Sequence, residues 1–266
     1  PRGRDVGTRA WACGLIGLFV VLPLLMVIGL AWQHDRVTRW AVEQISIEQE
    51  AKLGEIVFAQ QKAGLTLREG LAQEMVRSIG TRLSSGSRHR YRFFVAQDDS
   101  VNAFAMPGGY VVVHTGLLRL AKTPEEVAGV LAHEVSHVES RHSLQGMAKS
   151  IGLMAAVSLV FGDMNGLAGM GANLLTLKFS RDNETEADRA GLEALVAAGI
   201  DPAGMRDFFG RMAAQGKTMP DFLSSHPASA GRMADIDRLI KALPPTAATP
   251  LEFDYAAVKA SIGPPK

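Results

Sequence analysis

The segment from Thr123 to His142 restricts the possible folds of this chain more than any other. Thr123 is a typical N-cap residue, Pro124 stands at the first helical position, and Glu126 follows three residues after the cap. The helix that begins here is apolar over a broad arc, through Val127, Val130, Leu131, Val135 and Val138. We predict a buried core helix that ends near His142, in which each polar side chain needs a partner or a function.

The same helix carries the pattern H-E-x-x-H as His133, Glu134, Val135, Ser136 and His137. Side chains four residues apart lie on one face of a helix, so the two imidazoles would point at a common cation. Glu134 would reach a water bound to that ion and act as its general base. A chance match is the alternative, but burying two unpaired histidines and a carboxylate without a ligand is costly. The pattern therefore predicts a metal site.

A catalytic zinc site has three protein ligands and one open position, so one ligand must come from elsewhere in the chain. Glu184 and Asp188 are again four residues apart and share a helical face. We predict that Glu184 binds the metal and that Asp188 accepts the remaining imidazole N–H of His133. Glu186 is the reserve ligand, and a solvated acidic helix face is the alternative for the whole run. We expect His142 on the opposite side of its helix, either at the surface or behind a ligand.

The N-terminal part of the chain contains a long apolar run, from Ala10 to Trp32, without a charged residue. At about 1.5 Å per residue, a helix of this length crosses the roughly 30 Å hydrocarbon layer of a membrane. We predict a transmembrane anchor at 10–32 behind a short tail at 1–9. The alternative is a cleaved secretory signal, because Gly29 and Ala31 are small residues in a cleavable arrangement. The flanking arginines favour a cytoplasmic N-terminus only slightly.

Several further elements follow from local patterns. Apolar periodicity predicts helices at 43–61, 67–83 and 229–240, and a helix opened by Asp201 and Pro202. In that last helix four side chains are expected to face a core: Met205, Phe208, Phe209 and Met212. The β-rich residues at 91–96, 101–106 and 110–114 predict a small sheet, with a tight turn at Pro107 to Gly109.

Two other segments have less definite patterns. Residues 150–177 are apolar but interrupted near Gly162, so we expect a buried or lid-forming helical hairpin, with a re-entrant or interfacial segment as the alternative. Prolines and alanines after Pro244 predict a loosely ordered C-terminal tail at 244–266. The catalytic domain would then occupy residues 43–243.

Composition narrows the class of protein. Basic and acidic residues nearly balance, at 28 against 27, and no basic cluster is interleaved with aromatic residues, so nucleic acid is not an expected partner. Cys13 is the only cysteine, which excludes an intrachain disulfide and a cysteine zinc site. A hydrophobic content of 47% supports one well-packed domain. The sequence does not indicate an oligomeric state.

Three motifs in order along the chain resemble one peptidase family. They are the pattern at 133–137, the pair Glu184 and Asp188, and the run Ser225, His226, Pro227. Together they resemble family M-forty-eight, which includes the CAAX prenyl protease, HtpX and the mitochondrial inner-membrane quality-control proteases. The resemblance extends over about residues 48–240, and soluble periplasmic and outer-membrane-linked bacterial members are nearest in layout. Many metallopeptidases share the first motif, but the combination of the three is specific.

The resemblance implies a helix-rich α+β domain of the gluzincin type, with a small β-sheet and one zinc ion per chain. It implies endoproteolysis of unfolded or damaged envelope polypeptides, in a single-pass protein of the bacterial inner membrane whose catalytic domain lies in the periplasm. It also implies that Asn102, Ala103 and Phe104 line the cleft and pair with an extended substrate. His226 would stabilise the oxyanion or close the site by approaching the metal. Members with several spans work near the bilayer, whereas this chain has one clear span, which argues against intramembrane or prenyl-peptide cleavage.

The same motifs allow two alternative functions. One is a membrane-tethered, zinc-stabilised chaperone or adaptor, whose site is permanently closed by His226 or by the region from Gly162 to Gly171. The other is an enzyme that is latched until it is activated. Complete ligand and base positions favour hydrolysis over the first alternative.

Overall fold

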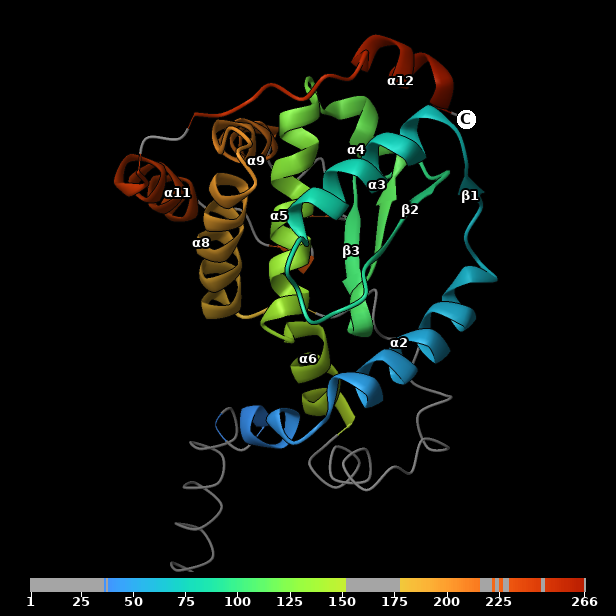
Figure 1. Ribbon diagram of the computed structural model, residues 1–266, viewed down its shortest axis with the longest axis vertical. Helices are drawn as coiled ribbons and strands as arrows, with labels where there is room; N and C mark the ends of the chain where they lie inside the picture. The colour runs from blue at the N-terminus through green and yellow to red at the C-terminus, as the bar shows by residue number, and fades with distance from the viewer. Residues whose placement is uncertain are drawn as a thin grey trace, which may run out of the picture.

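The computed structural model describes residues 36, 38–151, 178–215, 222, 225–226, 230–244 and 247–265. These residues form a helix-rich α+β domain with a small mixed sheet (Figure 1). In chain order, the elements are α2 (Ile47–Lys62), β1 (Leu67–Arg68), α3 (Leu71–Leu83), β2 (Arg92–Ala96), β3 (Ala103–Met106), the 3₁₀ turn η1 (Pro107–Gly109), β4 (Tyr110–His114), α4 (Thr115–Leu120), α5 (Pro124–Glu139), α6 (His142–Ile151), α8 (Arg181–Ala197), α9 (Ala203–Gln215), α11 (Ala230–Ala242) and α12 (Tyr255–Ile262).

Two predicted membrane or lid segments cannot be placed in this fold. The predicted anchor at 10–32 and nearly all of the apolar stretch at 150–177 lie outside the described residues. Among the helices that the structure does describe, none combines the length and the apolar character needed to cross a bilayer.

The sheet has the strand order β1-β2-β4-β3, so β3 is an edge strand. β2 and β4 run parallel, whereas β3 is antiparallel to β4 across the predicted turn, in which Gly108 and Gly109 have positive φ. The predicted strands and turn are therefore confirmed. The prediction of one helix at 67–83 is wrong at its start, because Leu67 and Arg68 pair with β2 and Gly70, with φ of 92°, interrupts the chain before α3.

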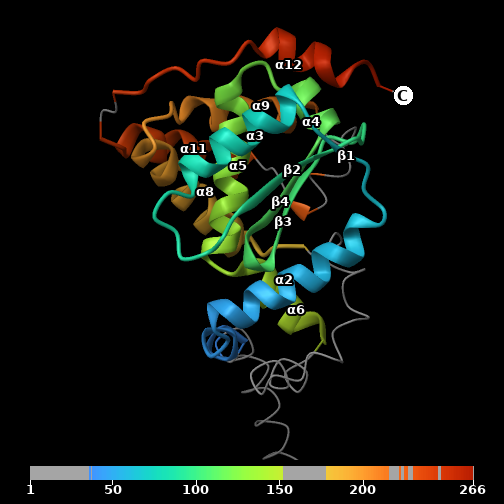
Figure 2. The same cartoon turned by 45° about the vertical axis from the view of Figure 1, so that its right-hand side comes forward.

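Helix α5 lies in the centre of the domain, with the sheet on one side and α8 and α9 on the other (Figures 1 and 2). Its predicted burial is confirmed, since Val127, Leu131 and Val138 are all in the core. Gly129 permits a close approach to α9, because a Cβ atom there would lie 2.5 Å from the Met205 Cα atom. The predicted core positions of α9 are confirmed, and Asp201 caps its start by accepting a hydrogen bond from the Ala203 N–H, at 2.9 Å.

Helix α2 crosses beneath the sheet and packs against the β3–β4 turn (Figure 2). The contact is backbone to backbone, because a Cβ atom on Gly54 would lie 2.0 Å from the Pro107 carbonyl oxygen. A second apolar cluster joins α2 to α6, through Leu53 and Val57 on one side and Leu144 on the other. Helix α2 is therefore an integral part of the domain.

The prediction of a loosely ordered tail at 244–266 is wrong. Asp254 caps α12, and Tyr255, Val258 and Ile262 are buried against the main core. The Tyr255 hydroxyl donates a hydrogen bond to the Leu118 carbonyl oxygen, at 2.7 Å. The proline and alanine content concealed an apolar stripe with helical spacing, which packs beside α3 and α4.

Candidate metal centre

The start of α5 follows the predicted capping chemistry. Thr123 Oγ1 accepts a hydrogen bond from the Glu126 N–H, at 3.3 Å, and Pro124 occupies the first turn. The Glu126 carboxylate accepts from the N–H of Lys122, and it also contacts the Arg211 guanidinium. The helix ends at Glu139, slightly before the predicted end.

Four side chains from three regions converge on one buried point. His133 and His137 come from α5 and Glu184 from α8, and His226 lies in a segment before α11. One ligand atom from each lies within 4.8 Å of the others, and all four residues are buried. The two imidazole Nε2 atoms are 3.0 Å apart. Glu184 lies across from them, with Oε2 at 3.5 Å from His133 Nε2 and Oε1 at 3.4 Å from His137 Nε2.

This donor set fits a divalent cation of the zinc type. Imidazole and carboxylate groups are the usual ligands of zinc, and a tetrahedral site needs four donors that face inward. Imidazole nitrogens that face one another in a buried space without solvent are unfavourable unless a cation or a proton lies between them. The structure therefore brings together the three ligands predicted from sequence.

The fourth member of the cluster is His226. Its Nδ1 atom is 3.2 Å from His133 Nε2 and 3.0 Å from Glu184 Oε1. Its Nε2 atom is 3.5 Å from Glu134 Oε1. The ring stacks on Phe222, with 4.7 Å between centroids, so an apolar side chain fixes its plane. His226 thus lies between the three predicted ligands and the predicted base.

Glu134 is buried beside the cluster, on the same helix as two of its members. Burial raises the pKa of its carboxyl group, while the nearby charges of His226 and His133 act in the opposite direction. A hydrogen bond with the Ala105 backbone N–H also opposes the increase in pKa. Among the described residues, Glu134 Oε1 has no hydrogen-bond partner. The carboxylate therefore retains an acceptor atom that faces the cluster.

A layer of ion pairs surrounds the cluster. Asp188 Oδ1 is 3.0 Å from His133 Nδ1, the contact that the four-residue spacing predicted. Arg232 from α11 donates to both oxygens of Asp188, at 2.7 Å each, and its Nη1 atom is 2.8 Å from Glu184 Oε2. Burial would raise the pKa of Asp188, but the hydrogen bonds from Arg232 and His133 outweigh it and lower that pKa.

The sequence interpretation missed Arg232. The sequence predicts a helix at 229–240 but assigns no role to Arg232, which lies 44 residues from Asp188. The one available signal was its place six residues after His226, which does not by itself indicate a contact.

His142 does not point away from the site, as the continued helix would require. The chain turns at Arg141, whose φ of 56° is left-handed, and His142 then begins α6. Its ring is buried, with Nδ1 at 3.0 Å from His137 Nδ1 and Nε2 at 3.5 Å from Glu186 Oε2. Of the two predicted locations, the one behind a ligand is therefore correct. Glu186, the reserve ligand, also accepts from the Ser140 hydroxyl at 2.9 Å and lies outside the cluster.

The protonation of the cluster without a metal follows from its neighbours. Burial alone would lower the pKa of His133, but hydrogen bonds with Asp188 and Glu184 raise it to about 9. Burial lowers the pKa of His137 well below its usual range. Burial would raise the pKa of Glu184, yet the surrounding imidazoles hold it well below its usual range. The pocket is thus arranged to keep the Glu184 carboxylate ionised.

The three residues predicted to bind substrate lie at the edge of the sheet. The Asn102 carbonyl accepts from the His114 N–H at 3.0 Å, and Ala103 and Phe104 begin β3. Among the described residues, the Asn102 side-chain oxygen is buried without a hydrogen-bond partner. β3 packs against both α5 and α6, so this edge borders the metal cluster.

Comparison with known proteins identifies the protein family to which this chain belongs. The sequence profile of peptidase family M48 matches residues 67–240, and the chain belongs to this family. It is 32% identical over 212 residues to a beta-barrel assembly-enhancing protease of Yersinia pestis, covering 72% of this chain and 44% of that protein. It is 30% identical over 242 residues to the protein of the same name in Escherichia coli K12, covering 82% and 49%.

Similarity extends to a mitochondrial metalloendopeptidase. The chain is 37% identical over 145 residues to the mitochondrial metalloendopeptidase OMA1 of Arabidopsis thaliana, covering 53% of this chain and 30% of that protein. The resemblance inferred from the three motifs is therefore confirmed at the level of the family. The chain spans less than half the length of the beta-barrel assembly-enhancing proteases that it matches.

Proposed function

We propose that this protein is a zinc-dependent endopeptidase that hydrolyses peptide bonds of unfolded or damaged envelope proteins. One observation carries the proposal: three imidazoles and a carboxylate, all buried, turn one donor atom each toward a point that a single ion can occupy. Membership of a peptidase family supports the same conclusion. The fold would then be of the gluzincin type, with two helical histidines and a distant glutamate as ligands.

The residues divide into three roles under this proposal. His133, His137 and Glu184 hold the zinc ion, and Asp188 fixes the imidazole of His133 through its other nitrogen. A bound zinc ion supplies a Lewis acid that polarises a carbonyl and lowers the pKa of water toward about 7. Glu134 accepts the proton of the attacking water, because its free oxygen faces the cluster and its raised pKa makes it a stronger base.

Substrate would bind along the edge strand. In an antiparallel register with β4, Ala103 directs its backbone groups away from the sheet, whereas the outward-facing groups of Ala105 are already bonded to Glu134 and Ser143. An extended peptide can add to such an edge through main-chain hydrogen bonds, with little preference for sequence. The buried side-chain oxygen of Asn102 would gain a partner from a substrate N–H.

His226 would regulate access to the metal. A catalytic zinc site keeps one position for water, whereas His226 contributes a fourth donor within 3.2 Å of His133. We therefore assign the described arrangement to a closed state, in which His226 must move aside before solvent and substrate enter. Once displaced, the imidazole could donate to the developing oxyanion.

Location follows from the sequence and is part of the proposal. Residues 10–32 would anchor the chain in the bacterial inner membrane, with the catalytic domain at 43–243 in the periplasm. Bacterial relatives of similar sequence support a bacterial setting. The partners would be polypeptide substrates and the lipid around the anchor.

Casein degradation by the purified full chain tests the activity. Glu134→Gln should reduce cleavage by about 10²- to 10⁴-fold while leaving bound zinc unchanged, because the variant loses the base and keeps the ligands. Glu184→Ala should lose zinc and activity together. A wild type that contains no zinc after purification with zinc, or a Glu134→Gln variant with full activity, would contradict the proposal.

A non-proteolytic chaperone or adaptor is the second candidate, and the fourth donor from His226 favours it. His226→Ala separates the two. A latched enzyme should cleave casein faster when this side chain is removed. A protein that cleaves no unfolded substrate with or without His226, yet still binds zinc, would be the zinc-stabilised adaptor.

A further inference from the structure

A second site with buried charges lies away from the metal cluster, which is formed by His133, His137, Glu184 and His226. The structure describes five buried carboxylates: Glu50, Glu126, Glu134, Glu184 and Asp188. Three of them belong to the cluster or support it, and Glu126 binds the start of α5. Glu50 on α2 remains, with only 1% of its surface exposed. Burial of a carboxylate is unfavourable unless it is paired and hydrogen-bonded, so this residue requires an explanation beyond helix formation.

Arg141, which follows the end of α5, is the partner of Glu50. Its Nε atom is 2.7 Å from Glu50 Oε2, and its two terminal nitrogens donate to the carbonyl oxygens of Val42 and Ile45, at 2.9 and 2.7 Å. The planar guanidinium therefore uses all three nitrogens on the N-terminal segment. Arg141 also has a left-handed φ of 56°, which residues other than glycine rarely adopt. The surrounding contacts hold this turn in place.

The turn at Arg141 carries two contacts to the site. The next residue, His142, contacts Nδ1 of His137, which is the nitrogen that remains when Nε2 faces the cluster. The residue after it, Ser143, donates from its hydroxyl to the Ala105 carbonyl oxygen in β3, at 2.9 Å. A shift of Arg141 would therefore displace a partner of one histidine and a support of the edge strand.

The other oxygen of Glu50 reaches the turn that follows β3. The Gly108 N–H donates to Glu50 Oε1, at 3.3 Å, from the turn that joins β3 to β4. A Cβ atom on Gly108 would lie 2.9 Å from the Ala51 Cα atom, so this turn sits directly on α2. One carboxylate thus joins α2 to the turn at Arg141 and to the turn after β3. Glu50 also precedes residues 67–240, the part of the chain that matches the family.

We propose that Glu50 and Arg141 are positioning residues. Through them, helix α2 sets the orientation of the His137 imidazole and the position of strand β3. Neither side chain touches the metal cluster. Arg141 acts through His142 and Ser143, and Glu50 acts through Arg141 and Gly108. The proposal rests on the metal-binding function proposed above, since it assigns the pair a role in metal affinity and substrate turnover.

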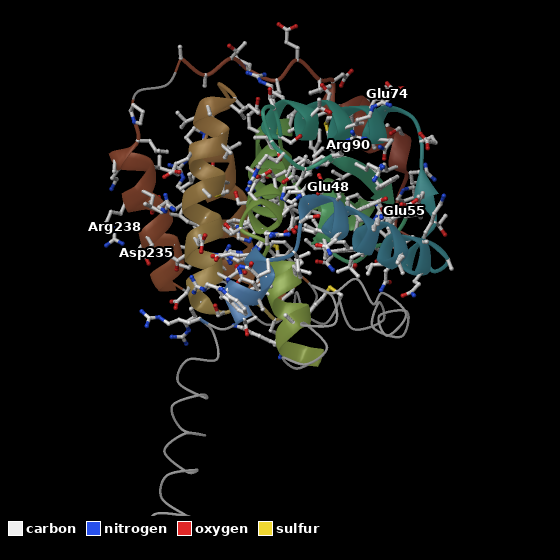
Figure 3. The ribbon with its side chains drawn as sticks, turned by 60° about the horizontal axis from the view of Figure 1, so that its bottom comes forward. Glu48, Glu55, Glu74, Arg90, Asp235 and Arg238 are labelled. Atoms are coloured by element: carbon white, nitrogen blue, oxygen red, sulfur yellow. The ribbon has the colours of Figure 1, made fainter. Side chains whose placement is uncertain are left out.

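The experiment compares matched variants of the full chain. Glu50→Gln keeps the shape of the side chain and removes its charge, and Glu55→Gln makes the same change at an exposed position of α2 (Figure 3). Arg141→Lys keeps the charge but not the planar fork, and Arg238→Lys is its control on the exposed face of α11, where Arg238 pairs with Asp235 (Figure 3). Each variant is measured for zinc affinity, by competition with a chromophoric chelator, for kcat and KM on casein, and for thermal midpoint without metal.

Glu50→Gln and Arg141→Lys should each weaken zinc binding by up to about tenfold, because both disturb His142, and direct loss of an outer partner of a metal ligand costs about tenfold to a hundredfold. They should also lower kcat, while both controls remain at the wild-type values. A lower thermal midpoint with unchanged zinc affinity and kcat in both variants would show a purely structural pair and overturn the proposal. A wild type that binds no zinc would instead overturn the proposed function, and the positioning role with it.

Discussion

The two ends of helix α5 are fixed in different ways. At the N-terminal end, Thr123 caps the helix by a hydrogen bond to a residue three positions away, and Pro124 sets the first turn. At the C-terminal end, Arg141 contacts residues that precede it by 91 to 99 positions. The first end depends on local chemistry and the second on the fold. The histidines of the metal cluster lie toward the second end, so the site depends on long-range contacts.

Loss of the long-range contacts should have the largest effect on stability. Arg141→Ala removes one partner of a buried pair and leaves the Glu50 carboxylate without compensation, which costs about 3–5 kcal/mol. The free energy of urea unfolding of the full chain measures this loss. Arg141→Gly should be less destabilising than the alanine variant by about 1 kcal/mol, because glycine accepts the left-handed backbone. A loss below about 1 kcal/mol in the alanine variant would show that the two ends of α5 do not differ.

Removal of zinc should come next and should affect the two ends unequally. At free zinc a hundredfold above its dissociation constant, chelation removes about 2.7 kcal/mol of stability. Amide hydrogen exchange should increase more from His133 to Glu139 than from Val127 to Leu131, because only the first segment contains proposed ligands. Equal acceleration along the whole helix would contradict this expectation.

Loss of the local cap should have a smaller effect that is confined to stability. Thr123→Ala removes the acceptor for the Glu126 N–H and should cost about 1 kcal/mol. Thr123→Ser keeps that acceptor and should remain close to the wild type. Zinc affinity and kcat/KM of the folded variants should not change. A fall in zinc affinity in the alanine variant would mean that the N-terminal end also positions the ligands.

Loss of an exposed ion pair should have the smallest effect on the free energy of unfolding. It provides the reference value for the buried pair of Glu50 and Arg141. Arg189 and Glu193 on α8 are 2.8 Å apart, and their side chains are 53% and 55% exposed. Arg189→Gln should change the free energy of unfolding by less than about 0.5 kcal/mol, because solvent screens such a pair. A change as large as that of Arg141→Ala would remove the distinction between buried and exposed pairs on which the comparison depends.

The same contrast explains how much of the molecule could be predicted from sequence. The four-residue spacing of His133 and His137, and of Glu184 and Asp188, indicated two helical faces that meet, and the structure brings these side chains together. Helix starts, strands and the glycine turn also follow from local chemistry. Each of these signals lies within a few residues of the feature that it predicts.

The parts that were missed have partners far along the chain. Arg232 reaches Asp188 across 44 residues, and nothing near it in sequence indicates that contact. The left-handed turn at Arg141 was missed because the residue is not glycine, so His142 was expected on the wrong side. Helix α12 was missed because its composition suggested a tail, although its apolar positions repeat with helical spacing. Such features become visible only when the elements are packed.

The edge strand β3 has a consequence for the behaviour of the protein in solution. An open sheet edge can recruit other chains and cause aggregation. Here the outward-facing groups of Ala105 are already engaged, the N–H by Glu134 and the carbonyl by Ser143. Only a short length of edge around Ala103 is left for another backbone, so another chain can form few main-chain hydrogen bonds there. Under the proposed function, this short free edge would limit how many main-chain hydrogen bonds an unfolded substrate can keep with the protein.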